Sequence, residues 1–306
     1  MTLKIIFMGT PKFSVPILKS IHDADYDIIQ VYTQPPKKKN RGQKINQTPV
    51  HNYSDIKKIN VRHPETLNTD EELDFFKKIK PDIVVVVAYG QILPKKLLNI
   101  KKVKFINVHA SLLPKWRGAA PIQRSIMNQD TETGISIMKI IPKLDAGPVM
   151  MKDKIKISKD TNFENLSQDL SQLAAKMIIK SIKLIESGKA NFTNQNEEEA
   201  TYANKIEKKE TKINWADKAK KILAKINAFY PSPGSWFDYK GARFKVNKAI
   251  EVQVKGRPGE ILDNKLTIAC AENAIQILEI QKEGKKNMSV LEFLKGNNFE
   301  IGSNVN

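Results

Sequence analysis

The N-terminal part of the chain alternates between short, continuously apolar runs and segments in which apolar residues recur every three or four positions. Short apolar runs bounded by Gly, Pro or polar residues indicate strands, and the longer spacing indicates amphipathic helices. The segment DIVVVVA at 82–88 is rich in β-branched residues, which is typical of a strand buried on both faces of a parallel sheet. The pattern predicts strands at 3–8, 27–33, 82–88, 104–109, 133–140 and 149–157, and helices at 14–22, 70–80, 122–128 and 162–187.

Strands that alternate with helices predict an α/β domain with a Rossmann-like, mostly parallel sheet. The sequence turns polar and loses its period from Gly188 to Thr211, as expected of a linker or domain boundary. A predicted helix at 216–228 is then followed by short strand-like runs such as KLTIAC and AIQILEI, which favour a small OB-like β-barrel. We therefore expect a first domain at 1–188, a linker at 189–208 and a C-terminal β-barrel domain at 209–306.

Composition restricts the class of protein. With 306 residues, 41% hydrophobic and 27% charged, the chain is expected to be globular and to hold two domains. No apolar run is long enough to cross a bilayer, and the start MTLKIIFMGT looks like a first strand, not a signal peptide. The single cysteine, Cys270, excludes an internal disulfide, so we expect a cytoplasmic protein.

The formal net charge of +18 suggests a polyanionic partner, because Lys and Arg neutralise phosphates. The same excess can reflect a genome that favours Lys, Ile and Asn, so total charge leaves nucleic-acid binding open. The basic segment at 34–53, QPPKKKNRGQKINQTPVHNY, is more informative because it has no acidic residue and directly follows the second predicted strand. A charge run of this kind is usually a solvated loop. Its cations are Lys37, Lys38, Lys39, Arg41 and Lys44.

Asn107 and His109 lie two residues apart at the end of the strand predicted at 104–109. Because side chains alternate along a strand, both fall on one face. An Asn amide can donate to a developing oxyanion, and an imidazole can take or give a proton near neutral pH. Asp145 lies in a loop between two later strands and could orient the imidazole. The three side chains predict an acyl-transfer site, although a lone His at a strand end is more often structural.

Other chemistries have weaker signals. The turn MGTPKF at 8–13 has one glycine where a dinucleotide-binding turn needs three, which disfavours an NAD-dependent oxidoreductase. The four histidines show no ligand-like spacing, so we expect no metal. Ser111 and Cys270 lack the local signature of a nucleophile, and we expect both to be structural.

Several segments together resemble the methionyl-tRNA formyltransferase family, a branch of the folate-dependent formyltransferases. They are FMGTPKFSVPIL, VAYGQILP, INVHASLLPKWRGAAPIQ, TGISIMKI with LDAGPV, YPSPGSWF and GKKNMSVLEFLKG, and they run through nearly the whole chain. The INVHASLLPKWRGAAP block is highly specific to folate-dependent formyltransferases. The resemblance implies formyl transfer from 10-formyltetrahydrofolate to the α-amino group of methionyl-initiator tRNA, which releases tetrahydrofolate. We expect a monomer that needs no metal.

The same resemblance implies roles for individual residues. Asn107, His109 and Asp145 match the family's catalytic set, the first domain would be catalytic and the C-terminal barrel would bind tRNA. The residues implied to lie at the folate are Tyr89, Gly90, Ser111, Leu112, Leu113 and Pro114. Those implied to reach the acceptor stem of the tRNA are Lys37, Lys38, Lys39, Arg41 and Lys44, in a segment whose composition suggests mobility.

The acceptor is less firmly implied than the donor, because the wider class also formylates amino sugars and a purine precursor. The basic segment and the second domain favour tRNA. Trp116 and Arg117 could line the methionine or the terminal adenosine, and Trp116 could equally be a structural anchor. A non-catalytic RNA-binding protein that has kept the fold is a further alternative.

Overall fold

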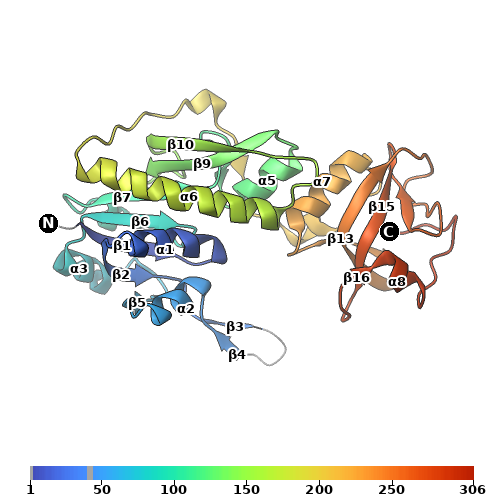
Figure 1. Cartoon of the computed structure of the whole chain (residues 1–306), viewed down its shortest axis with the longest axis horizontal. Helices are drawn as coiled ribbons and strands as arrows, with labels where there is room; N and C mark the ends of the chain where they lie inside the picture. Colours follow the sequence, from blue (N-terminus) through green and yellow to red (C-terminus); the bar gives the residue numbers. More distant parts are fainter. Residues whose placement is uncertain (1–2, 40–43) are drawn as a thin grey trace. The chain divides into compact units, whose positions relative to one another are not determined.

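The computed structural model describes residues 3–39 and 44–306 and divides into two compact units, whose elements are labelled in Figure 1. The first unit comprises Met1–Gly118, Thr133–Ile155 and Ser167–Tyr202. The second comprises Ala119–Glu132, Lys156–Leu166 and Ala203–Asn306. The chain therefore passes between the units several times, and most of the stretch expected to be a linker belongs to the first unit.

The first unit is built on a seven-stranded sheet with the order β10-β9-β7-β6-β1-β2-β5. β1 pairs in parallel with β2 and β6, β2 with β5, and β6 with β7, whereas β7 and β9 are antiparallel. β6 is buried at every position, as its unbroken β-branched run requires. The strands are β1 (Lys4–Gly9), β2 (Asp27–Tyr32), β5 (Val61–Arg62), β6 (Ile83–Val87), β7 (Lys104–His109), β9 (Glu132–Lys139) and β10 (Val149–Lys156).

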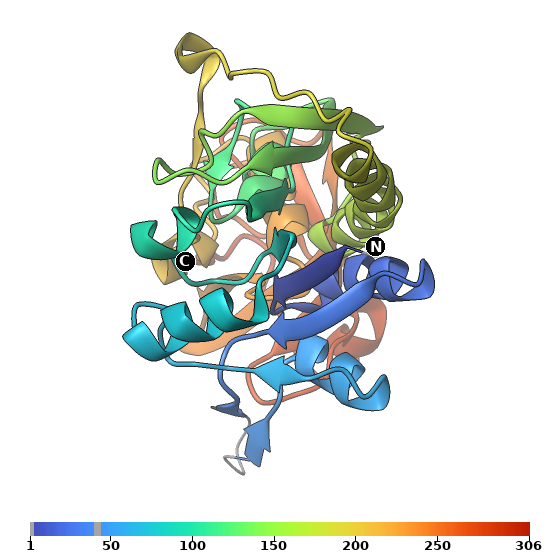
Figure 2. The same ribbon diagram turned by 90° about the vertical axis from the view of Figure 1, so that its left-hand side faces the viewer.

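Helices cover both faces of this sheet, with α1 and α6 on one side and α3 and α4 on the other (Figure 2). Local sequence explains where α3 begins: the Thr69 side chain accepts a hydrogen bond from Glu72 N, and acidic residues fill the first turn. The helices of this unit are α1 (Val15–Asp23), α2 (Pro49–Ile56), α3 (Asp70–Ile79), α4 (Lys95–Leu98) and α6 (Phe163–Glu186), with short 3-10 turns η1 (Lys12–Ser14) and η2 (Glu197–Glu199).

The basic segment contains more regular structure than a solvated loop. β3 (Lys37–Lys39) pairs antiparallel with β4 (Lys44–Asn46), and α2 begins at Pro49. Thr48 caps this helix by accepting a hydrogen bond from His51 N, and a proline in the first turn loses no intrahelical bond. This Thr-Pro signal could have predicted α2 from the sequence.

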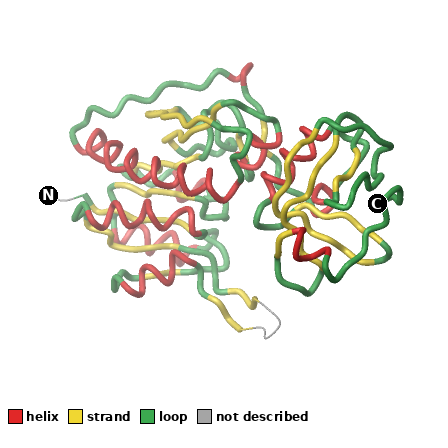
Figure 3. Tube along the Cα trace, turned by 45° about the vertical axis from the view of Figure 1, so that its right-hand side comes forward, coloured by secondary structure: helices red, strands yellow, loops and turns green. Residues whose placement is uncertain are grey.

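The second unit is built on a curled, antiparallel five-stranded sheet (Figure 3). Its order is β12-β13-β15-β14, with β16 beside β15. Aromatic rings fill its core: the Phe244 ring centroid lies 5.6 Å from that of Phe237 and 5.3 Å from that of Phe299. The elements are α5 (Pro121–Met127), η3 (Lys208–Thr211), α7 (Ala219–Phe229), β12 (Ser235–Tyr239), β13 (Ala242–Val252), β14 (Thr267–Ala269), β15 (Ala274–Lys282), β16 (Met288–Ser289) and α8 (Val290–Leu294); two short strands outside both main sheets are β8 (Arg117–Gly118) and β11 (Tyr202–Ala203).

The predicted fold class is confirmed: a Rossmann-like, mostly parallel sheet is followed by a small C-terminal β-domain. The strand predicted at 104–109 is present with the same bounds, and every other strand and helix predicted before residue 188 agrees within one residue at each end. Of the described helices, none has the length and apolar content that a membrane span requires.

Candidate active site

The carboxyl ends of the parallel strands β2, β1, β6 and β7 meet at one edge of the sheet, where α/β proteins usually bind ligands. A group of hydrogen bonds joins three of these ends. Thr10 Oγ1, after β1, donates to the Tyr89 carbonyl oxygen (2.7 Å) and accepts from Gln34 N (3.3 Å). Gln34 Nε2 donates to the same carbonyl at 3.3 Å. These bonds fix the point at which the basic segment leaves β2.

Asn107 and His109 both lie on β7, which is paired on both sides. Asn107 is opposite Val86 of β6 and Met138 of β9, so the backbone that carries it is held from two directions. Its side chain is half-buried, whereas His109 is only 6% exposed. Within residues 3–39 and 44–306 the Asn107 amide makes no hydrogen bond, which leaves it available to a bound molecule.

The His109 ring lies between two oxygen atoms. Nε2 is 2.8 Å from the Trp116 carbonyl oxygen, and because a carbonyl only accepts, Nε2 donates in this bond. Nδ1 is 3.6 Å from Asp145 Oδ2. This separation is longer than a hydrogen bond but short enough for the carboxylate to stabilise positive charge on the ring. The hydrogen bond from Nε2 therefore orients the ring, whereas Nδ1 has no acceptor within hydrogen-bond distance among the described residues.

Asp145 is held in an unusual backbone conformation. Its φ is 44°, in the left-handed region that residues other than glycine rarely adopt. Its Oδ2 accepts a hydrogen bond from Gly118 N at 2.9 Å. Two residues later the chain passes very close to β9, since a Cβ on Gly147 would lie 1.7 Å from the Lys139 carbonyl oxygen. Close backbone approach thus sets the position of the carboxylate.

The segment expected at the folate, Ser111 to Pro114, is mostly internal. Ser111, Leu113 and Pro114 are buried, and Leu112 is half-buried. Ser136 Oγ donates to the Ser111 carbonyl oxygen (2.7 Å) and accepts from Leu113 N (3.0 Å), which ties the segment to β9. Leu112 is the member whose side chain reaches the surface. Folate contact by this segment stays a prediction.

Tyr89 and Gly90, also expected near the folate, follow β6. The Tyr89 ring is buried in the apolar core of the first unit, and burial raises the pKa of its hydroxyl. Its carbonyl oxygen is the part that lies at the strand-end edge. Gly90 is exposed with a φ of 87°, which favours glycine. A ligand at this point would meet backbone and not the phenol ring.

The structure describes only part of the predicted tRNA contacts. Lys37 is exposed at the start of β3, the Lys38 and Lys39 backbones continue that strand, and Lys44 begins β4. Arg41 lies outside the described residues. The four described lysines are thus carried by a pair of strands that follows the Gln34 hydrogen bonds, and their contact with RNA stays a prediction.

The sequence allows Arg117 to line the methionine or the terminal adenosine, whereas the structure buries its side chain. Its side chain is 0% exposed, and its guanidinium donates to both Glu197 carboxylate oxygens at 3.0 Å and to Gln195 Oε1 at 3.0 and 2.9 Å. Arg117, together with Lys143, lowers the pKa of Glu197 to about 2. No local signal points to Gln195 or Glu197, because they lie 78 and 80 residues from Arg117 in a stretch without periodicity.

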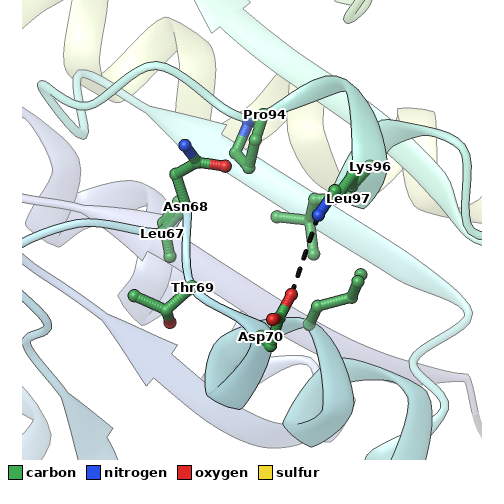
Figure 4. Close-up of a pocket in the computed structure, with 8 residues that line it drawn as sticks. Leu67, Asn68, Thr69, Asp70, Pro94, Lys96 and Leu97 are labelled. Carbon is green, nitrogen blue, oxygen red and sulfur yellow. Dashed lines mark ion pairs between the residues drawn. The ribbon is translucent and has the colours of Figure 1, made fainter.

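Two of the cavities lined by described residues lie in the first unit. Figure 4 shows the smaller, of about 20 Å³, where the Lys96 ammonium is 3.7 Å from Asp70 Oδ1. This volume suits a single water molecule. The larger, of about 210 Å³, is lined by Val149, Met150, Met151, Lys152, Thr193, Asn194 and Gln195. In the described part of the chain no three His, Cys, Asp or Glu side chains lie together so that they could hold a metal ion.

Comparison with known proteins gives matches along the whole chain. The family model described as Formyl transferase matches residues 3–182, and that described as Formyl transferase, C-terminal domain, matches residues 205–298. A methionyl-tRNA formyltransferase from Pelagibacter ubique is 52% identical over 307 residues, covering 100% of this chain and 99% of that protein. One from Bradyrhizobium diazoefficiens is 41% identical over 308 residues, covering 99% of each.

Solved structures share the fold at lower identity. HypX from Aquifex aeolicus in complex with tetrahydrofolic acid has a TM-score of 0.68 at 17% identity, covering 99% of this chain and 51% of that one. The N-formyltransferase from Helicobacter canadensis in complex with folinic acid and dTDP-3-aminofucose has a TM-score of 0.66 at 18% identity, covering 92% of this chain and 100% of that one. At these identities the likeness concerns the fold alone.

Proposed function

The chain belongs to the formyl transferase family, and from this membership we propose that it transfers the formyl group of 10-formyltetrahydrofolate to the α-amino group of methionyl-initiator tRNA. The full-length similarity to methionyl-tRNA formyltransferases supports this donor and acceptor. The observation that carries the proposal is the placement of Asn107 and His109 on one face of β7, with Asp145 Oδ2 3.6 Å from His109 Nδ1.

The first step is attack of the acceptor amine on the formyl carbon. A carbon–nitrogen bond forms, and the carbonyl oxygen of the formyl group becomes the oxyanion of a tetrahedral intermediate. Fixed donors stabilise such an oxyanion because they need no reorganisation as charge develops. The Asn107 amide is the first donor, since it is unpaired among the described residues and β7 is held on both sides.

The second step is collapse of the intermediate, in which the bond from the formyl carbon to the folate nitrogen breaks. The amine loses a proton, and the departing folate nitrogen gains one. His109 relays this proton through Nδ1, the ring nitrogen without a close acceptor. Its Nε2 stays hydrogen-bonded to the Trp116 carbonyl oxygen. Asp145 stabilises the ring while it carries the extra proton. The relay returns His109 to its starting state, and no covalent enzyme intermediate is required.

Charge supports an RNA acceptor over a small amine. The chain carries a net charge of +18, and the basic segment concentrates cations after β2, at the same sheet edge as β7. Lysines placed there would neutralise phosphates of the acceptor stem and position its end, without reading bases. A small amine without phosphates would gain nothing from these cations.

The test is transfer of labelled formyl from 10-formyltetrahydrofolate to initiator and elongator methionyl-tRNA. We expect wild type to formylate the initiator and His109→Ala to lose the reaction. A triple Lys→Ala variant at 37, 38 and 39 should weaken tRNA binding and reduce the slope of log affinity against log salt by about 3. The matched control neutralises three exposed lysines of α6, Lys176, Lys180 and Lys183, and should keep the wild-type salt slope.

Two outcomes would contradict the proposal in different ways. Activity on a small amine with none on either tRNA would show that the acceptor is wrong and the donor right. Absence of formyl transfer to every acceptor, in a folded protein, would reject the enzymatic function.

A further inference from the structure

We propose that Gln195 is a positioning residue of the active site, which fixes the Asp145 loop and through it the carboxylate that faces His109. The inference deepens the proposed function and rests on it for its kinetic consequences. Its basis is a set of contacts that connects residues 195–201 to both sides of the His109 ring.

The Gln195 amide uses both of its ends. Nε2 donates to the carbonyl oxygens of Asp145 and Gly147, both at 2.8 Å, so it bridges the loop on either side of Ala146. Oε1 accepts two hydrogen bonds from the Arg117 guanidinium, at 3.0 and 2.9 Å. Only an amide can accept from the guanidinium and donate twice to carbonyl oxygens in this orientation. The side chain therefore links Arg117 to the Asp145 loop.

Arg117 is a fixed anchor for this link. Its side chain is 0% exposed, and its bidentate pair with Glu197 sets the plane of the guanidinium. Lys143, two residues before Asp145, pairs with the same carboxylate, with its Nζ 2.6 Å from Glu197 Oε2. The loop is thus connected to residues 195–197 through its backbone and through one of its side chains.

The same stretch holds the other side of the His109 ring. Thr201 Oγ1 accepts from Trp116 N at 2.9 Å, and the Thr201 carbonyl oxygen accepts from Arg117 N at 2.8 Å. The Trp116 carbonyl oxygen is the group that accepts from His109 Nε2. Residues 195–201 therefore fix the groups on both sides of the imidazole.

Backbone conformation explains why such support is needed. Asp145 has a φ of 44° and Trp116 a φ of 60°, values that side-chain-bearing residues avoid. Conformations of this kind persist only where the surroundings hold them. Two hydrogen bonds from Gln195 hold the loop of Asp145. Two hydrogen bonds to Thr201 hold Trp116 and its neighbour Arg117.

The segment lies outside the two matched family regions. They end at residue 182 and begin again at residue 205, so residues 195–201 fall between them. A polar connection between matched regions would ordinarily be regarded as a linker. The contacts instead assign it a part in organising the candidate catalytic residues.

Gln195→Glu keeps the contact of the side chain with Arg117 and removes its contact with the Asp145 loop. The new carboxylate has the same shape and still accepts from Arg117, but it has no hydrogen to donate to the Asp145 and Gly147 carbonyl oxygens. We expect kcat to fall by about 10- to 100-fold, because a small displacement of a catalytic group is costly, with KM for tRNA unchanged. Gln195→Met, which loses both contacts, should show at least the same loss.

The control is Gln172→Glu, the same substitution at an exposed glutamine of α6. For each variant we would measure kcat, KM and melting temperature, and record the ring ¹⁵N resonances of His109 in protein without substrate. The inference predicts that both Gln195 variants lose kcat and shift the His109 resonances. Gln172→Glu should change neither kcat nor the resonances.

The two readouts distinguish the failure of this inference from failure of the proposed function. Unchanged His109 resonances in both Gln195 variants would overturn the positioning role, whatever the activity. If wild type does not formylate methionyl-tRNA, the proposed function fails, and the resonances alone still decide whether Gln195 positions the ring.

Discussion

Gly147 offers a direct way to displace the Asp145 loop without removing a functional group. A Cβ at this position would lie 1.7 Å from the Lys139 carbonyl oxygen of β9. An ordinary carbon–oxygen contact is about 3.3 Å, so Gly147→Ala must move the loop away from β9 by about 1.6 Å. Both partners are backbone, and no side-chain rotation can relieve the contact.

The displacement has calculable consequences. The Gln195 Nε2 bond to Gly147 O (2.8 Å) and the Lys139 N bond to Pro148 O (2.9 Å) would stretch beyond hydrogen-bond length. The loss of these two hydrogen bonds and the strained contact lower the free energy of unfolding by about 3 kcal/mol. A catalytic group misplaced by about 1 Å costs about 100-fold in rate, so we expect kcat to fall by at least that factor.

The matched control is Gly296→Ala, because a Cβ at Gly296 meets no atom within 4 Å and neither glycine has a positive φ. We expect this control to keep wild-type kcat and melting temperature. Formyl transfer and thermal unfolding would be measured for both variants. If Gly147→Ala were as active as Gly296→Ala, a displaced loop would not matter to catalysis, and the argument from close backbone approach would be wrong.

Three further predictions test other parts of the structure. The depressed pKa of Glu197, about 2 against an ordinary 4.5, means that its pairing stabilises the fold above pH 4.5 and is lost as pH falls toward 2. Melting temperature measured across that range should therefore fall less steeply in Glu197→Gln than in wild type. Burial raises the pKa of the Cys270 thiol to about 12, so iodoacetamide should alkylate it only after unfolding, as mass spectrometry would show, and rapid labelling of the native protein would contradict this. Arg124 Nη1 lies 2.6 Å from Glu210 Oε2, and Arg124 Nε donates to the Asn204 carbonyl oxygen at 3.1 Å. Arg124→Met should therefore lower the free energy of unfolding, measured in urea, by about 2 kcal/mol. An unchanged urea midpoint would show that these contacts do not stabilise the fold.

Much of the fold followed from the sequence because the signals are local. The run IVVVV of β6 could only be a doubly buried strand, and the Asp145 loop was expected between two strands, which are β9 and β10. The family and its activity were also predicted, from motifs spread along the chain, and the comparisons confirm that prediction. The domain boundaries, the residue roles, the monomeric state and the cytoplasmic location stay predictions.

The failures share a cause. From its place in the INVHASLLPKWRGAAP block Arg117 could line the acceptor, and nothing near it in sequence shows that it is buried against Glu197. A charge run such as the basic segment is usually a solvated loop, whereas the structure forms β3, β4 and the start of α2 there. In neither case does the residue type alone show the contact that decides the structure.

The sequence by itself determined the strands and helices that carry the site, the spacing that puts Asn107 and His109 on one face of β7, and the family. These follow from backbone periodicity and from residue types within a short window. Only the tertiary structure decided that Asp145 stands 3.6 Å from His109 and that Gln195 bridges the Asp145 loop to a buried Arg117. Such contacts join residues separated by 36 to 78 positions, and their geometry depends on how the whole sheet and its connections close, which no local pattern encodes.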